Sequence, residues 1–162
     1  MKISKLMGDI IRAKERELSG GVRSPFTYRL IEKPNGKKAV AVLVRNAYFV
    51  IVPEERFYLD RNKVFSPLVP VDLEKLVDWT DFEYSDSAVD TGVVRTITDN
   101  RKVKVLETDP ADAVGDTVWI DVNTLTYYEE DRLEYKATEK NKAVYFIEDD
   151  DLVGVIMPVN HA

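Results

Sequence analysis

Side chains that could carry out catalysis are few in kind in this chain. It has 29 aspartates and glutamates, one histidine and no cysteine among 162 residues. The histidine, His161, is the penultimate residue, whereas a general base must be held rigidly within hydrogen-bond reach of the group it serves. The sequence also lacks a P-loop and a G-x-G-x-x-G run. We therefore predict no catalytic residue and expect a protein that is not an enzyme.

Two groups of carboxylates raise the question of metal binding. One is Glu148 to Asp151, between two apolar runs, and the other comprises Asp109, Asp112 and Asp116. A calcium loop of the common kind alternates oxygen ligands and adds a glycine and a distal glutamate, and neither group has that spacing. We predict no metal and no cofactor. Carboxylates spaced like phosphates would also suit an acidic inhibitor, a DNA mimic that occupies the basic cleft of a nucleic-acid enzyme.

Positive charge is concentrated at the start of the chain. Residues 1–38 contain ten basic and four acidic side chains, a net charge of +6, although the whole chain has a net charge of -6. Such a segment can form a face for duplex DNA, and its candidate phosphate ligands are Lys5, Arg12, Arg16 and Arg23. The alternative is a solvated helix in which Asp9 and Glu15 pair with neighbouring arginines.

The elements that must position these side chains follow from hydrophobic periodicity. Apolar residues from Ile3 to Leu18 recur at helical spacing, and Gly20-Gly21 should end that helix. A proline-led run from Pro70 to Trp79 predicts a second helix, and Asp121 is a candidate N-cap for a third. The remaining apolar segments predict strands at 26–31, 39–44, 47–52, 82–84, 89–98, 103–107, 118–120, 132–136, 143–147 and 152–159.

This order of elements predicts an α+β fold in which antiparallel sheets have short helices on one face. The length fits a single domain over residues 1–162, with candidate sub-units 1–68, 69–116 and 117–162. Gly154, inside the last predicted strand, suggests a bulge or a close approach of two backbones.

The C-terminal segment resembles the last βαβββ unit of a bacterial DNA sliding clamp, the processivity factor of the replicative polymerase. The resemblance is carried by four runs of residues: 118–121, 125–128, 143–147 and 152–158, the last ending in Met157-Pro158. It implies a clamp-like fold in which Met157, Pro158 and Val159 border a pocket for short peptides of DNA-processing proteins. A ring would then need several copies of this short chain.

The sequence departs from the clamp pattern in two places. No basic residue occurs from 121 to 131, where clamps line the duplex with lysine and arginine, and Asn160 and His161 follow Met-Pro where clamps commonly have an arginine. The alternative interpretation of Met157-Pro158 is a simple strand end, because proline cannot donate to a strand ladder.

These observations predict a non-enzymatic, clamp-like binding protein that self-associates or binds a partner and is associated with DNA in replication or repair. The alternatives are the acidic inhibitor and a structural interaction domain with no DNA role. We expect a cytoplasmic protein that does not enter a membrane, because no stretch approaches roughly 18 consecutive apolar residues. The lack of cysteine fits a reducing compartment.

Overall fold

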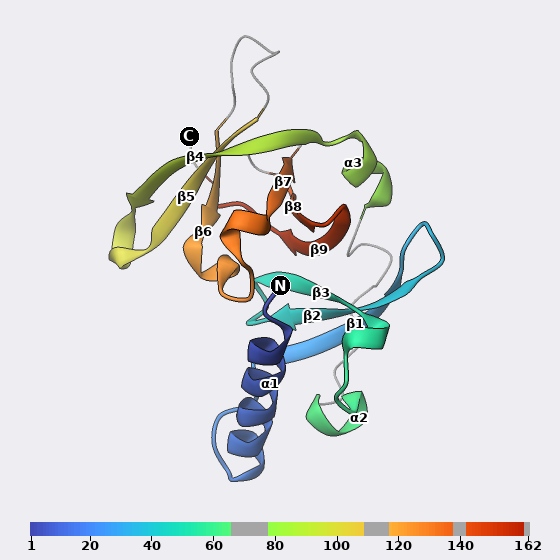
Figure 1. Ribbon diagram of the computed structural model, residues 1–162. Helices are drawn as coiled ribbons and strands as arrows, with labels where there is room; N and C mark the ends of the chain where they lie inside the picture. The colour runs from blue at the N-terminus through green and yellow to red at the C-terminus, as the bar shows by residue number, and fades with distance from the viewer. Residues whose placement is uncertain (66–77, 109–116, 138–141, 161–162) are drawn as a thin grey trace.

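The computed structural model describes residues 1–65, 78–108, 117–137 and 142–160, and this part of the chain is built around one nine-stranded sheet (Figure 1). The strands lie in the order β1-β2-β3-β9-β8-β7-β4-β5-β6, and every neighbouring pair is antiparallel. The predicted α+β class with antiparallel strands is thus confirmed. The strands are β1 (Phe26–Glu32), β2 (Lys38–Val44), β3 (Tyr48–Pro53), β4 (Asp86–Thr96), β5 (Lys102–Thr108), β6 (Thr117–Asp121), β7 (Glu134–Ala137), β8 (Val144–Glu148) and β9 (Asp151–Ile156).

The first helix, α1 (Ile3–Leu18), covers one face of the β1–β3 meander (Figure 1). Its buried stripe, which includes Leu6, Met7 and Ile10, joins the larger hydrophobic core with Val40, Val42 and Val50 from β2 and β3. The helix ends at Leu18, just before the predicted Gly20-Gly21 pair, and Gly20 has a φ of 86°, a left-handed conformation that glycine adopts without strain.

The helix α3 (Trp79–Tyr84) packs on the opposite face of the sheet from α1. Its Trp79 and Phe82 lie against a smaller hydrophobic cluster that contains Ile31, Ile51 and Tyr145. The helices therefore lie on both faces and not on one, because strands such as β2 are buried on both sides and both sides need cover.

The strand predicted at 82–84 is wrong, since these residues belong to α3. Asp78 caps this helix by accepting a hydrogen bond from the amide of Asp81, 3.0 Å away. The Phe82 ring packs edge-on against Tyr145, with ring centroids 5.2 Å apart. A cap and tertiary packing therefore override the short apolar-polar alternation that suggested a strand. Residues 70–77 of the helix predicted from Pro70 lie outside the described residues.

Two strands that are distant in the sheet order come together at the C-terminal tail. The Val159 amide donates to the Trp119 carbonyl of β6 at 2.7 Å, so the tail after β9 reaches the far edge of the sheet. Gly154 in β9 lies beside a bulge, one of the two features that its position predicted. The close contact there is made by a side chain and not by a second backbone, since a Cβ at Gly154 would be 2.5 Å from the hydroxyl of the buried Tyr128.

The segment between β6 and β7 forms tight turns in place of the predicted helix. Asp121 is the N-cap, as expected, and accepts from the Asn123 amide at 2.9 Å, but only the 3-10 helices η4 (Val122–Leu125) and η5 (Glu130–Arg132) follow. The other short helices are η1 (Glu54–Arg56), α2 (Arg61–Val64) and η3 (Thr98–Asn100).

Candidate nucleic-acid interface

Three of the predicted phosphate ligands lie on one exposed stripe of α1. Lys5, Arg12 and Arg16 are all exposed, and they fall on the side of the helix away from its buried residues. At a rise of about 1.5 Å per residue, they span roughly 16 Å along the helix axis. We call these three residues the basic stripe. Arg23, the fourth candidate, is exposed in the loop after α1.

Asp9 lies within the basic stripe and is shared between two elements. Its Oδ1 atom is ion-paired with the Arg12 guanidinium, and its Oδ2 atom accepts a hydrogen bond from the Tyr127 hydroxyl at 2.7 Å. Burial by itself would raise the pKa of Asp9, but the bonds from Tyr127 and Arg12 and the nearby charge of Lys5 outweigh it and lower that pKa. Asp9 is therefore ionised at neutral pH and offsets one of the three positive charges.

The other two cations of the stripe are less engaged. Lys5 and Arg16 form no ion pair with any residue in the described part of the chain, and Arg16 Nε donates only to the Arg12 carbonyl, 3.4 Å away. Beside the stripe, a shallow pocket of about 510 Å³ opens towards solvent. It is lined by Arg12, Glu15, Arg16, Ser19, Gly21 and Val22.

Arg45 places a positive charge near Tyr48 and Tyr127. It is exposed in the turn between β2 and β3, where its φ is 52°. Its charge acts on the two tyrosines around Asp9, since it opposes the rise in the pKa values of Tyr48 and Tyr127. Burial dominates both shifts and raises the pKa of Tyr48 to about 12. Both phenols are therefore neutral at physiological pH.

The predicted peptide-binding residues at the C-terminus have separate surroundings. Met157 is 62% exposed, Pro158 is buried, and Val159 is half-buried with its backbone bonded to Trp119. The segment thus contributes one exposed side chain to the surface, and its backbone helps to join β6 to the strand β9. The segment that resembles the last βαβββ unit of a sliding clamp has, in this structure, the order β6, 3-10 turns, β7, β8, β9.

Carboxylates of the β8–β9 turn are used for internal ion pairs. Asp149 and Asp150 both have positive φ, 51° and 62°, the pattern of a tight type I′ hairpin turn. On either side of the turn, Glu148 lies 2.5 Å from the Met1 ammonium, and Asp151 lies 2.6 Å from Nζ of the buried Lys33. Asp149 and Asp150 are exposed and have no ion pair among the described residues, whereas the Asp151 side chain is paired although it is 44% exposed.

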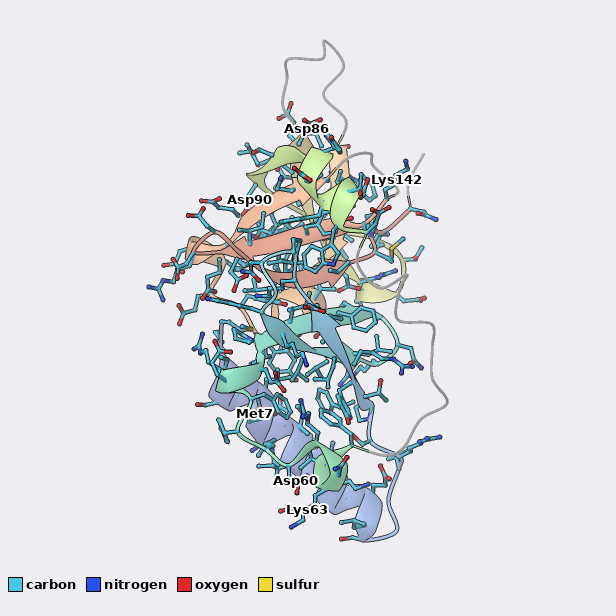
Figure 2. The ribbon with its side chains drawn as sticks, turned by 90° about the vertical axis from the view of Figure 1, so that its right-hand side faces the viewer. Met7, Asp60, Lys63, Asp86, Asp90 and Lys142 are labelled. Atoms are coloured by element: carbon cyan, nitrogen blue, oxygen red, sulfur yellow. The ribbon has the colours of Figure 1, made fainter. Side chains whose placement is uncertain are left out.

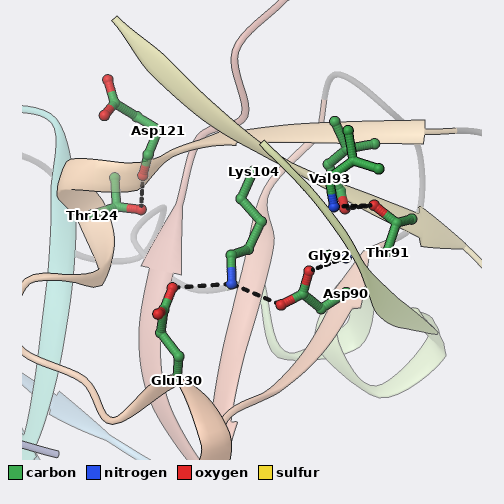
Figure 3. A network of polar contacts seen from close by, with 9 residues as sticks. Asp90, Thr91, Gly92, Val93, Lys104, Asp121, Thr124 and Glu130 are labelled. Atoms are coloured by element: carbon green, nitrogen blue, oxygen red, sulfur yellow. Dashed lines mark hydrogen bonds and ion pairs between the residues drawn. The ribbon is translucent and has the colours of Figure 1, made fainter. Parts of the chain in front are cut away.

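A buried lysine in β5 lies at the centre of a polar network (Figure 3). Lys104 Nζ lies 2.7 Å from Asp90 Oδ2 and 3.0 Å from Glu130 Oε1. Asp90 sits at a bulge of β4, and its other oxygen accepts from the Gly92 amide at 2.9 Å. Burial would lower the pKa of Lys104, but the two carboxylates raise it, so the ammonium stays charged.

Close to this network, the hydroxyl of Tyr135 is the one buried side-chain oxygen or nitrogen without a hydrogen-bond partner in the described ranges. Burial and the nearby carboxylates raise the pKa of Tyr135 to about 12, although the charge of Lys104 opposes that rise. The phenol is therefore neutral and unreactive at physiological pH. Figure 2 places this part of the molecule, marked by Asp90, in the opposite half from α1, marked by Met7.

The described ranges contain neither a metal-binding cluster nor a membrane-spanning helix. No group of three or more histidine, aspartate or glutamate side chains there could hold a metal ion. Asp109, Asp112, Asp116 and His161 lie outside those ranges. No helix of the described part is both long and apolar enough to cross a membrane.

Sequence reasoning found the basic stripe but missed the residues around Asp9. Tyr127 is 118 residues from Asp9, so no local pattern could pair them. Arg45 was recognisable as a turn residue, but its effect on Tyr127, which lies far from it in the sequence, depends on the tertiary fold.

Comparison with known proteins gave no match for this chain. No family model matches the chain, and no curated protein or solved structure was found to be similar to it.

Proposed function

We propose that this protein is a non-enzymatic binding protein that contacts the phosphate backbone of duplex DNA through the basic stripe of α1. The observation that supports this most directly is the imbalance of charge on that stripe. Of the three exposed cations only Arg12 is ion-paired, with Asp9, and Lys5 and Arg16 have no ion-pair partner among the described residues. Lysine and arginine that neutralise phosphates release counterions, which gives affinity without sequence preference.

The geometry suits a backbone contact better than recognition of bases. The cations lie in a row on an exposed helix whose opposite side is held in the core, so they are presented on a rigid element. Charged side chains directed at phosphates fix position but carry no sequence information. Clamp-like assembly of several copies stays a prediction of the sequence resemblance and is tested by the same experiment.

The test measures the absolute mass of the protein by light scattering, together with its binding to a short labelled DNA duplex at low and moderate salt. We expect salt-sensitive binding that the double variant Arg12→Glu plus Arg16→Glu weakens about tenfold or more, because two phosphate contacts become repulsive. A mass of several subunits would support a ring.

The matched control is Lys37→Glu plus Lys38→Glu. These lysines are exposed at the β1–β2 turn, which lies well away from α1 in Figure 1, and the change in net charge is the same. Equal weakening by both double variants would show that net charge, and not the stripe, governs binding. A wild-type protein that is indifferent to DNA at low salt would contradict the proposed function.

A further inference from the structure

Asp9 has the contacts that a bound phosphate would have on the basic stripe. It is an anion, it is held by the Arg12 guanidinium, and Lys5 is close enough to lower its pKa. Carboxylates and phosphates are recognised by arginine in the same way, through charge-assisted N–H···O bonds. The side chain of Arg12 is 61% exposed, so a second anion could reach the guanidinium from solvent.

The Asp9 carboxylate is also fixed in place from a different part of the fold. The Tyr127 hydroxyl donates to Asp9 Oδ2 at 2.7 Å, and the Lys2 amide donates to the Tyr127 carbonyl, also at 2.7 Å. The segment after β6 is therefore hydrogen-bonded both to Lys2, at the start of α1, and to Asp9. An acidic side chain held this way cannot swing away from the stripe as freely as a solvated one could.

Arg12, in contrast, lies folded along its own helix. A Cβ built on Gly8 would be only 3.3 Å from Arg12 Nη1 and 3.4 Å from Nη2. Its guanidinium thus rests against the helix surface at Gly8, beside Asp9. To meet a phosphate above the helix it must leave this resting position.

We infer that Asp9 is an internal competitor for the basic stripe, which holds Arg12 in the free protein and yields it to a DNA phosphate in the complex. This inference rests on the proposed function and assigns a regulatory role to one residue of the same site. Asp9 lowers the affinity for any polyanion, so only an anion with several phosphates in a row, able to engage Lys5 and Arg16 as well, displaces it.

The test compares duplex binding by Asp9→Asn, Asp9→Glu and Glu15→Gln. Asparagine keeps an oxygen that can accept from Tyr127 but cannot compete as an anion. We expect Asp9→Asn to bind the duplex about two- to fivefold more tightly, the range that loss of an exposed ion pair covers. The slope of log affinity against log salt should steepen by about 0.9, the value for one added phosphate contact.

The two other variants are controls. Asp9→Glu keeps the competing charge and should bind like the wild type. Glu15→Gln removes the same charge from the exposed side of α1, six residues further along, where the carboxylate has no ion pair with Arg12. If Glu15→Gln strengthens binding as much as Asp9→Asn, the effect is one of net charge, and the inference is overturned.

The failure of this inference can be told apart from failure of the proposed function. Wild-type binding that Asp9→Asn leaves unchanged or weakens would overturn the role of Asp9 and leave the interface standing. No binding by either protein at low salt would overturn both. Binding by Asp9→Asn alone would also contradict both, because the wild type would then not yield Arg12 to DNA. Thermal melting of each variant checks that it is folded, because Asp9 links α1 to Tyr127.

Discussion

Lys104 in β5 and the basic stripe of α1 carry the same kind of charge in very different surroundings. Lys104 is buried and has two carboxylates within 3.0 Å of its ammonium group. Of the three cations of the stripe, only Arg12 is ion-paired in the described part of the chain, with Asp9. Where counter-charge is complete, a cation serves the fold; where it is incomplete on an exposed surface, the cation is available to a partner.

The acidic turn between β8 and β9 follows the same rule with opposite sign. The two carboxylates that flank the turn are matched by internal cations, Met1 for Glu148 and Lys33 for Asp151. A run of four acidic residues therefore leaves only Asp149 and Asp150 without an ion pair among the described residues, fewer unpaired carboxylates than the sequence suggests for a DNA mimic. The proposed function consequently relies on the stripe.

The comparison between Lys104 and the basic stripe is tested most strongly by substitution of Lys104, where we expect the largest loss of stability. Lys104→Met keeps the apolar stem but leaves Asp90 and Glu130 without their cation. It should lower the free energy of unfolding by about 2 kcal/mol, less than for a fully buried pair because both carboxylates reach solvent. Chemical denaturation measures this change, and DNA binding should be unaffected.

Lys5→Met is the matched control for that variant, because it removes the same charge from the stripe. It should change the free energy of unfolding by no more than about 0.5 kcal/mol, as is usual for surface positions. Its effect should fall on DNA binding, with the salt slope reduced by about 0.9. The comparison is wrong if Lys5→Met destabilises the protein as much as Lys104→Met does.

A smaller difference in unfolding free energy is expected between variants of two buried tyrosines, Tyr128 and Tyr135. The Tyr128 hydroxyl donates to the Val153 carbonyl at 2.5 Å, whereas the Tyr135 hydroxyl has no partner among the described residues. Tyr128→Phe should therefore cost about 1 to 2 kcal/mol of unfolding free energy, since it leaves a buried carbonyl unpaired. Tyr135→Phe should be neutral or stabilising by up to about 1 kcal/mol. Equal losses in urea titrations would show that Tyr135 has a partner after all.

The smallest expected effect is the pH dependence of the Lys104 network. Burial would raise the pKa of Asp90, but bonds from Lys104 and the Gly92 amide lower it below its ordinary 3.8. Its contribution is therefore present above about pH 4 and lost as pH falls through the lowered pKa. The raised pKa of Lys104 gives a contribution present below its ordinary 10.5 and lost as pH rises beyond it.

The difference in stability between the wild type and Lys104→Met should consequently be constant from about pH 4 to pH 10 and shrink below pH 4. Denaturation midpoints of the two proteins across that range measure it. A difference that grows as the pH falls below 4 would mean that the carboxylate of Asp90 does not stabilise the fold.

Much of the secondary structure could be predicted from local patterns. The apolar stripe of α1, its end just before Gly20, the β1–β3 meander and the closing β8–β9 hairpin all follow from periodicity and turn residues. Prediction failed at 82–84 and after Asp121, where short segments take their conformation from what they pack against. Phe82 is helical because Tyr145 and the Asp78 cap favour it, and neither is visible in a window of three residues.

The candidate site divides in the same way. The sequence by itself determined that α1 has a buried side and an exposed side with Lys5, Arg12 and Arg16 in one row, because both follow from helical spacing. Only the tertiary structure decided which charges are neutralised. Asp9 meets Tyr127, Lys33 meets Asp151, and Lys104 meets Asp90 and Glu130. These pairs depend on the strand order of the sheet, and the electrostatic energy of a charge depends on its distance to other charges in space and not along the chain.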